Sequence, residues 1–332
     1  MSRVHLFLLL FMGLIAAFLA DIVFGSVNLP VGEVWKTLTG TTSDNLIYRE
    51  IIFNHRLPKA LTAILTGAAL SIAGVLMQTL FSNPLAGPDV LGVTSGSSLG
   101  VALLTLGTSA LPAWFISGWG QVTAAFLGAI GVLLLIIIAS VKIRQTVSLL
   151  IVGMMFGYFT GAIVSILQSV SNPDALKLFI SWTFGSLSAV GWQQMGIMAP
   201  VIIIGTMVAL FLQKPLNILL LGKNYAGGLG ISVPHLRLWI ILATAILAGT
   251  STAFTGPIAF IGITMPHIAR GLFHTLNHRV ILPASLLCGS VTLLICDIIS
   301  QLPGMQGTLP INAVTALFGA PVIVWIIAHN KG

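Results

Sequence analysis

Few side chains in this sequence are of types that perform acid–base, metal or phosphate chemistry, and the histidines are the most suggestive of them. His267, His274 and His278 follow one another at intervals of seven and four residues. On a continuous helix this spacing would place them within about 40° of one face. Metal or haem ligation is one interpretation of such a face. Arg270 and Arg279 lie among the three histidines, which favours a solvated or partner-facing surface, so we expect no metal site.

The carboxylates give no sign of catalysis or of ion coupling. A carboxylate in the middle of a membrane span is costly and is kept only where it is used, so carriers driven by protons or sodium usually hold some there. Asp21 and Asp297 instead lie near the ends of apolar segments, and we expect no carboxylate pair at depth. The sequence also lacks a Ser/His/Asp set, which argues against an intramembrane enzyme.

A phosphate-binding loop is likewise missing from the sequence. Gly222-Lys223-Asn224 ends in Asn and lacks the upstream glycine of a Walker A motif. If ATP drives this protein, the ATPase is therefore a different chain. We expect neither enzymatic activity nor a cofactor in this one, and no nucleic-acid partner.

The composition is that of a polytopic membrane protein. Hydrophobic residues make up 57% of the chain and charged residues 6%, and the mean hydropathy is +1.06. A soluble domain would carry about a quarter charged residues. We predict an all-α fold that forms one transmembrane domain over residues 1–332.

Apolar segments bounded by charged residues, Pro or Gly predict about ten membrane spans, each of roughly 20 residues. The first lacks the small-x-small cleavage pattern of a signal peptide, so we expect it to remain as a span. An even number of spans puts both termini on one side. The predicted spans are 6–24, 60–81, 92–110, 120–140, 147–169, 193–213, 238–254, 257–273, 280–298 and 309–328.

The distribution of charge orients these spans. With the N-terminus in the cytoplasm, 9 of the 14 basic residues and only one acid, Asp89, fall on the inner side. This is the positive-inside bias, and it would be lost if one span were added or missed. We therefore expect both termini to be cytoplasmic. The inner basic residues are Arg3, Lys142, Arg144, Lys214, Lys223, Arg237, Arg270, Arg279 and Lys331.

Three polar segments between the predicted spans are longer than tight turns. On the outer side, 25–59 begins with a short surface helix near 30–38, and 171–192 holds another that starts at Asn172-Pro173-Asp174. On the inner side, 214–237 is too hydrophilic and too rich in glycine to span a bilayer, and it predicts one or two short surface helices. This inner segment is either a plain connector or a docking element for a soluble partner.

Several motifs in this chain resemble those of the membrane permeases of bacterial iron-siderophore, haem and cobalamin ABC importers, the FecCD family. The resemblance covers nearly the whole chain. It is carried by Arg56-Leu57-Pro58-Lys59, the 67–74 run GAALSIAG, Asn83-Pro84-Leu85-Ala86-Gly87-Pro88, the 219–230 run, Gly256-Pro257-Ile258-Ala259-Phe260-Ile261-Gly262, Pro266-His267-Ile268-Ala269-Arg270, His278-Arg279 and Gly319-Ala320-Pro321.

The resemblance implies a ten-span subunit of the bacterial inner membrane that pairs with a second permease copy, as a homodimer or a near-identical heterodimer. It also implies two cytoplasmic ATPase subunits and a periplasmic or lipid-anchored substrate-binding protein. The 214–237 loop would then be the coupling element that fills a cleft in the ATPase. Its expected contact residues are Leu219, Leu221, Gly222, Ala226, Leu229 and Gly230.

By the same resemblance, Arg56 and Lys59 would pair with acidic residues of the binding protein on the outer side. Lys59 stands where the cobalamin permeases have Arg. The lysine keeps the positive charge but cannot form the two parallel hydrogen bonds that a guanidinium group makes with a carboxylate. A third basic residue of those permeases is here Gln301, a departure that puts a strict cobalamin assignment in doubt. Without the resemblance, snorkelling at the mouth of a span would explain Arg56 and Lys59.

Polar residues within the spans are candidates for the translocation path, although hydrogen bonding between helices explains them equally well. They are Thr160, Ser165, Gln168 and Asn312. The sequence thus predicts the permease of an ATP-driven importer for an iron-siderophore, haem or a cobalamin. The alternatives are a carrier that works alone on an ion gradient and a structural subunit with no path.

Overall fold

The computed structural model describes residues 2–25, 27, 29–38, 46–107, 118–143, 145–301 and 308–329, and within these ranges all regular structure is helical. The longer helices are α1 (Arg3–Val23), α4 (Leu57–Phe81), α7 (Gly118–Lys142), α8 (Thr146–Val170), α10 (Trp192–Phe211), α13 (Val233–Thr255), α15 (His278–Ser300) and α16 (Ile311–His329). The shorter ones are α2 (Val31–Leu38), α3 (Leu46–Glu50), α5 (Val93–Thr105), α9 (Pro173–Thr183), α11 (Gln213–Leu219), α12 (Lys223–Gly228) and α14 (Ile261–Phe273), with a π-helix at Ile51–Arg56 and 3₁₀ turns at Pro88–Leu91 and Leu187–Ala189.

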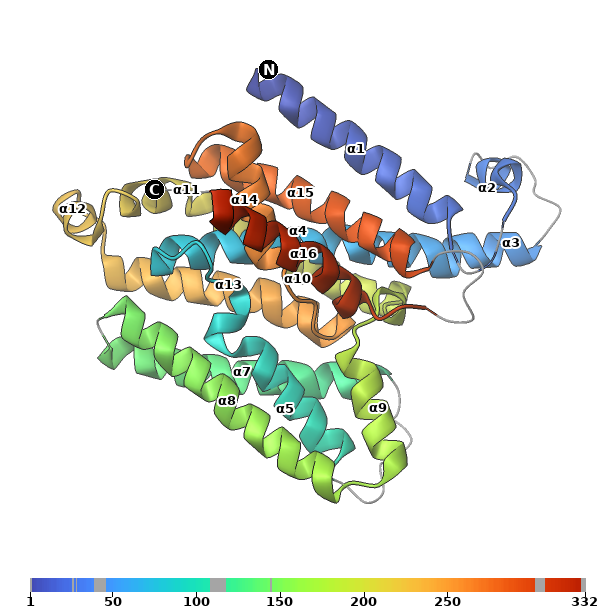
Figure 1. Ribbon diagram of the computed structural model, residues 1–332, viewed down its shortest axis with the longest axis horizontal. Coiled ribbons are helices and arrows are strands. Elements are labelled where there is room, and N and C mark those ends of the chain that lie inside the picture. Colours follow the sequence, from blue (N-terminus) through green and yellow to red (C-terminus); the bar gives the residue numbers. More distant parts are fainter. Residues whose placement is uncertain are drawn as a thin grey trace.

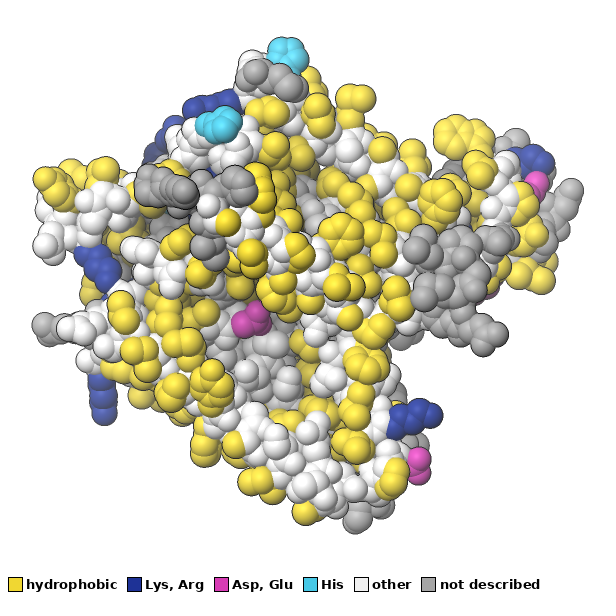
Figure 2. All heavy atoms as spheres, viewed as in Figure 1, with side chains coloured by type: hydrophobic (Ala, Val, Ile, Leu, Met, Phe, Trp, Pro, Cys, Tyr) yellow, Lys and Arg dark blue, Asp and Glu magenta, His cyan; other side chains and the backbone are white. Residues whose placement is uncertain are grey.

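Each of the ten predicted spans coincides with one helix, so the all-α prediction is confirmed. Seven of the described helices are long and apolar enough to cross a membrane. Helices α5 and α14 have 13 residues each, about 20 Å, against a hydrocarbon core of roughly 30 Å. Figure 2 shows apolar side chains over much of the middle of one face, with Lys and Arg gathered toward its two ends.

The second predicted span starts earlier than the sequence indicated. Residues 46–81 form one continuous helix of 36 residues, so part of the predicted polar segment 25–59 is helical. Pro58 favours a helix boundary because its ring clashes with the carbonyl group four residues earlier. Here the wider π-helical turn at Ile51–Arg56 lies directly before it, and a bulge of this kind accommodates a proline within a helix.

Helix α4 lies at the centre of the bundle, with α10, α13, α14 and α15 packed around it (Figure 1). Of its 25 residues, 21 are buried. Its glycines allow main-chain contact, because a methyl group on Gly67 would overlap the carbonyl oxygen of Gly289 in α15 and one on Gly74 would overlap that of Gly262 in α14. Small residues of this kind let membrane helices approach closely.

A second group of helices, α5, α7 and α8, lies beside this centre, with α9 next to it (Figure 1). Helices α5 and α7 pack at glycines, since a methyl group on Gly96 would lie 2.5 Å from the carbonyl oxygen of Gly128. Helix α8 keeps one long side exposed, which includes Met155, Tyr158 and Phe159. This side is available to lipid or to a partner.

Two breaks in the chain, at 82–92 and 256–260, each precede one of the 13-residue helices. The first passes against α14, where His267 Nε2 lies 2.7 Å from the carbonyl oxygen of Pro84. Gln78 Nε2 donates to the carbonyl oxygen of Ile263 at 3.0 Å. The first break and the end of α4 are therefore in contact with α14, the helix that follows the second break.

The surface helices predicted in the polar segments are confirmed. Helix α2 covers residues 31–38, and α9 begins where Asn172 Oδ1 accepts a hydrogen bond from the N–H of Ala175 at 2.8 Å. The segment 214–237, predicted for the inner side, forms two short helices, α11 and α12, which are separated at Gly222 (φ 106°). The predicted end of the third span at 108–110, and also Asp44, Arg144 and Lys331, lie outside the described residues.

The contact of α4 with α14 makes Gly74 the most constrained glycine of the centre. We expect Gly74→Ala to lower the free energy of unfolding by about 1–3 kcal/mol, because the added methyl group forces two main chains apart. Thermal unfolding in detergent measures the change. Gly131→Ala is the matched control, since nothing lies within 4 Å of a methyl group at that position. Equal melting temperatures for the two variants would contradict this account.

Candidate functional site

The C-terminal ends of α1 and α15 and the N-terminal end of α4 meet in a buried ionic cluster. Lys59 Nζ lies 2.5 Å from Asp297 Oδ2 and 3.5 Å from Asp21 Oδ1. All three side chains are nearly inaccessible, with relative exposures of 4% or less. Gln301 Nε2 donates to both oxygens of Asp297 at 3.1 and 3.2 Å. Asp21 and Asp297 thus lie near helix ends, as the sequence indicated. The sequence did not indicate that the two carboxylates share one lysine.

The guanidinium group of Arg56 is hydrogen-bonded to carbonyl groups at and just after the end of α1. Its Nη1 donates to the carbonyl oxygens of Ile22 and Val23 at 2.6 and 2.7 Å, and its Nη2 donates to that of Val27. The last carbonyl groups of a helix have no partner within the helix and carry its negative end. Arg56 thus holds α1 to the π-helical turn that precedes α4. Snorkelling does not describe Arg56, because its side chain is buried.

Arg56 and Lys59, the two predicted docking residues, nevertheless line one cavity. Its volume is about 480 Å³, and Asn54, His55 and Gln301 contribute to its wall. A partner's acidic side chain would reach the two cations only by entering this cavity. Docking through Arg56 and Lys59 stays a prediction.

At the opposite end of the molecule, α11 is packed against the bundle and α12 projects from it (Figure 1). Of the predicted coupling residues, Leu219 and Ala226 are buried and hold the two short helices in place. Leu221 and Leu229 are each 62% exposed, and Tyr225 is 71% exposed. The segment therefore presents large apolar side chains at one end of the molecule.

Gly222 and Gly230 bound α12 on either side. Their φ angles are 106° and 82°, values that side chains other than glycine rarely adopt. Both are exposed. Their role is to direct the chain into and out of α12, so these two positions shape the segment whether or not a partner contacts them.

A polar link that sequence reasoning missed joins α11 to the bundle. Asn217 Oδ1 accepts hydrogen bonds from the N–H of His278 at 2.8 Å and from its Nδ1 at 2.9 Å, while Nδ2 of Asn217 donates to Asn277 Oδ1 at 3.0 Å. His278 Nε2 lies 2.8 Å from Thr79 Oγ1 of α4. One histidine thus ties α11, α4 and α15 together. The sequence drew attention to His278 by its spacing from His267 and His274 and by its place next to Arg279 in a family motif, but it gave no sign of the contact with Asn217.

The common histidine face suggested by the spacing of seven and four residues does not form. Helix α14 ends at Phe273, and His274 adopts a left-handed conformation (φ 45°) before α15 begins at His278. The continuous helix on which the shared face depended is therefore absent. His267 and His278 each bond to a different neighbour, as described above.

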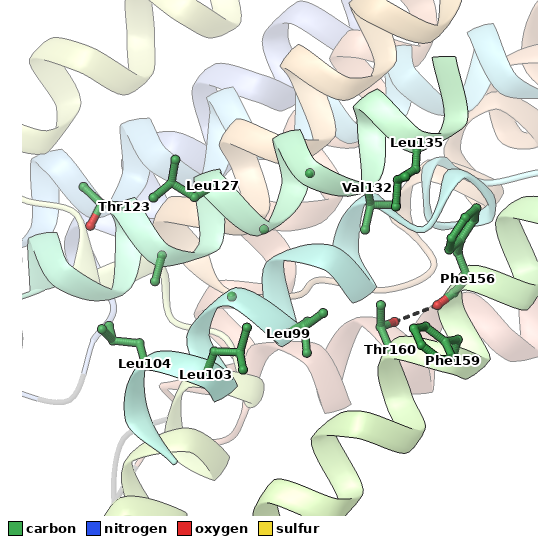
Figure 3. A pocket seen from close by; sticks show the side chains of 14 residues that line it. Leu99, Leu103, Leu104, Thr123, Leu127, Val132, Leu135, Phe156, Phe159 and Thr160 are labelled. Atoms are coloured by element: carbon green, nitrogen blue, oxygen red, sulfur yellow. Dashed lines mark hydrogen bonds between the residues drawn. The ribbon is translucent and has the colours of Figure 1, made fainter. Parts of the chain in front are cut away.

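Three of the four predicted path residues lie on α8. Thr160 is buried and borders an apolar groove of about 910 Å³ between α5, α7 and α8 (Figure 3). Its hydroxyl donates to the carbonyl oxygens of Phe156 and Gly157, and that of Ser165 donates to Gly161. Gln168 is half-buried. The hydroxyl groups are thus used within their own helix, and a role in the path stays a prediction.

Asn312, the fourth of these residues, has a structural task at the start of α16. Its Oδ1 accepts a hydrogen bond from the N–H of Ala259, and its own N–H donates to the carbonyl oxygen of Phe184. Asn312 therefore joins three segments of the chain around the second break.

Comparison with known proteins places this arrangement in a family. The model of the FecCD transport family matches residues 13–329. The chain belongs to the FecCD transport family. As a FecCD chain with several apolar helices it is a multi-pass membrane permease, and the resemblance seen in the motifs is confirmed.

Individual FecCD relatives cover most of the chain. It is 35% identical over 320 residues to the vitamin B12 import system permease protein BtuC of Klebsiella pneumoniae, covering 96% of this chain and 92% of that one. Identity to BtuC of Vibrio cholerae is 35% over 304 residues, with 90% and 88% covered. A solved chain from an ABC transporter assigned to the metal-chelate type, in an inward-facing conformation, matches with a TM-score of 0.85 and 28% identity over 98% of this chain and 99% of that one.

The buried cluster predicts that the stability of the fold depends strongly on Lys59. We expect Lys59→Met to lower the free energy of unfolding by about 3–5 kcal/mol, because it leaves two buried carboxylates without a cation. Thermal unfolding of the purified FecCD chain provides the measurement. Lys36→Met is the matched control, since Lys36 forms an exposed bridge with Glu33 at 2.9 Å and should change stability by less than about 1 kcal/mol. Similar losses for both variants would refute the stabilising role of the cluster.

Proposed function

We propose that this chain is the membrane-spanning permease of an ATP-driven importer that carries a bulky metal chelate across the bacterial inner membrane. Its membership of the FecCD family carries this proposal. The named relatives are vitamin B12 import permeases, so a cobalamin is the first cargo to test, followed by haem and iron-siderophores.

The proposed assembly contains two copies of this chain, two ATPase subunits and a substrate-binding protein. Ten spans with both termini in the cytoplasm place α11 and α12 on the inner side, where an ATPase would contact Leu221, Tyr225 and Leu229. The cavity at Arg56 and Lys59 then faces the binding protein. The exposed sides of α8 and α16 are the surfaces that we assign to the second copy and the path between the copies.

The proposed mechanism transmits motion from the ATPase to the spans. Closure of the two ATPases displaces α12 and α11. The Asn217 link passes this displacement to α15 and α4 through His278 and Asn277. The spans then tilt and switch access from one side to the other, a rigid-body transition of packed helices.

A carrier driven by an ion gradient is the second candidate, and the buried Asp21–Lys59–Asp297 cluster favours it, because ionisable groups within spans often serve ion coupling. Uptake by vesicles that contain the complete complex distinguishes the two. ATP-dependent uptake of cobalamin, haem or a ferric siderophore without an ion gradient is expected. Uptake that requires a gradient and ignores ATP would replace the first candidate with the second.

The apolar side of α12 predicts the effect of polar substitutions there. We expect Leu229→Ser, alone or with Leu221→Ser, to reduce co-purification of the ATPase and ATP-dependent uptake by about tenfold or more, because central apolar side chains contribute most to such interfaces. Leu46→Ser is the control, since Leu46 is 79% exposed and lies at the opposite end of the molecule. Unchanged binding in Leu229→Ser would exclude α12 as the contact.

The Asn217 link predicts a different defect. We expect Asn217→Ala to leave the ATPase bound and ATP hydrolysis active while uptake falls by about two- to tenfold, because a contact that transmits motion is lost rather than the docking surface. The ratio of substrate moved to ATP hydrolysed in vesicles measures this effect. Asn224→Ala, at an exposed position of α12, should keep the ratio of the unmodified chain. A loss of ATPase binding in Asn217→Ala would assign this residue to docking instead.

A further inference from the structure

A cavity of about 630 Å³ lies where the inner end of α7 meets α12 and the start of α13. Among the described residues that line it, Lys223, His235 and Arg237 are basic and none is acidic. It is separate from the apolar groove at Thr160 and from the outer cavity at Lys59, because the three share no lining residue. Lys223 belongs to α12, which moves in the proposed mechanism, but no transport step proposed above assigns a ligand to this cavity.

The basic side chains of this cavity are held in place. Arg237 is 8% exposed, and its Nη1 donates to the carbonyl oxygens of Ser140 and Ile143 at the end of α7. Lys223 Nζ donates to Thr146 Oγ1. Burial and the nearby positive charge of Arg237 lower the pKa of Lys223. Lys223 and Arg237 thus place two cations beside one cavity, an arrangement that an anion would stabilise.

Apart from Ser140, the rest of the wall is apolar and follows the last turns of α7 and the first turns of α13. Ile137 and Val141 lie on the last turns of α7, and Leu238 lies in the second turn of α13. Val141 is 80% exposed. The cavity therefore has a basic end at the inner boundary of the bundle and an apolar side that runs toward its middle.

We propose that this cavity binds an anionic phospholipid, with the phosphate of the headgroup at Lys223 and Arg237 and an acyl chain along Val141 and Ile137. A free phosphate or a nucleotide would use only the basic end. A lipid uses both halves at once, and it is present wherever the spans are embedded. Basic pockets between spans on the cytoplasmic side are where anionic headgroups are recognised.

The experiment titrates the purified full chain in detergent with dioleoyl phosphatidylglycerol, in the presence of excess dioleoyl phosphatidylcholine, and counts bound lipid by native mass spectrometry. We expect one phosphatidylglycerol to be retained per chain. Lys223→Gln should weaken its apparent affinity about fivefold, as the loss of one cation near a lipid phosphate implies. Lys214→Gln, an exposed position of the same inner segment outside the cavity wall, should not weaken it.

A second pair of variants tests the apolar half. Val141→Gln should weaken phosphatidylglycerol retention severalfold, while Val147→Gln, also at an exposed position and outside the cavity wall, should not. Equal retention of phosphatidylcholine would overturn the proposal. So would equal losses in Lys223→Gln and Lys214→Gln, which would indicate general surface charge. Full displacement of the lipid by millimolar inorganic phosphate would also overturn it, because the site would then bind a free anion.

Discussion

The close approach of main chain to main chain along α4 is the constraint on which the rest of the structure depends. Lipid is as apolar as the side chains that face it, so helices in a membrane associate through packing rather than through the hydrophobic effect. Gly67 and Gly74 bring α4 into direct contact with α15 and α14. The helix cannot shift sideways without losing both contacts, and its position fixes everything that is attached to its two ends.

Both candidate sites are attached to this one helix. Its N-terminal end carries Lys59, which is enclosed by carboxylates from α1 and α15, and its C-terminal end carries Thr79, which contacts His278 and through it Asn217 of α11. The cavity at Arg56 and Lys59 and the short helices α11 and α12 therefore lie at the two ends of one element. A tilt of α4 changes both at once, which suits a protein that must open to one side as it closes to the other.

The sequence located the elements well, because each apolar run and each glycine-rich break is a local pattern. Helices α11 and α12 followed from the polar, glycine-rich character of 214–237 alone. The pairing of Lys59 with Asp21 and Asp297 could not be derived in the same way, since it joins residues that are distant in the chain, although their shared position near outer span ends was a usable signal. The hydrogen bonds between Asn217 and His278 were still harder to predict from the sequence, because an asparagine in a surface segment can have many roles. The histidine face failed for a local reason, the left-handed turn at His274.

The partners that fix α4 come from distant parts of the chain. Gln78 and Ile263, whose contact accompanies the approach of α4 to α14, are separated by 185 residues. At a synthesis rate of about 5–20 residues per second, α4 waits roughly 10–40 s in the membrane before that neighbour exists. During biosynthesis α4, the most enclosed helix of the finished protein, thus faces lipid. Its glycines and buried polar side chains do not yet have the packing partners that α14 provides. A chain truncated before α14 would keep that surface exposed, and we expect the quality-control proteases of the membrane to degrade it.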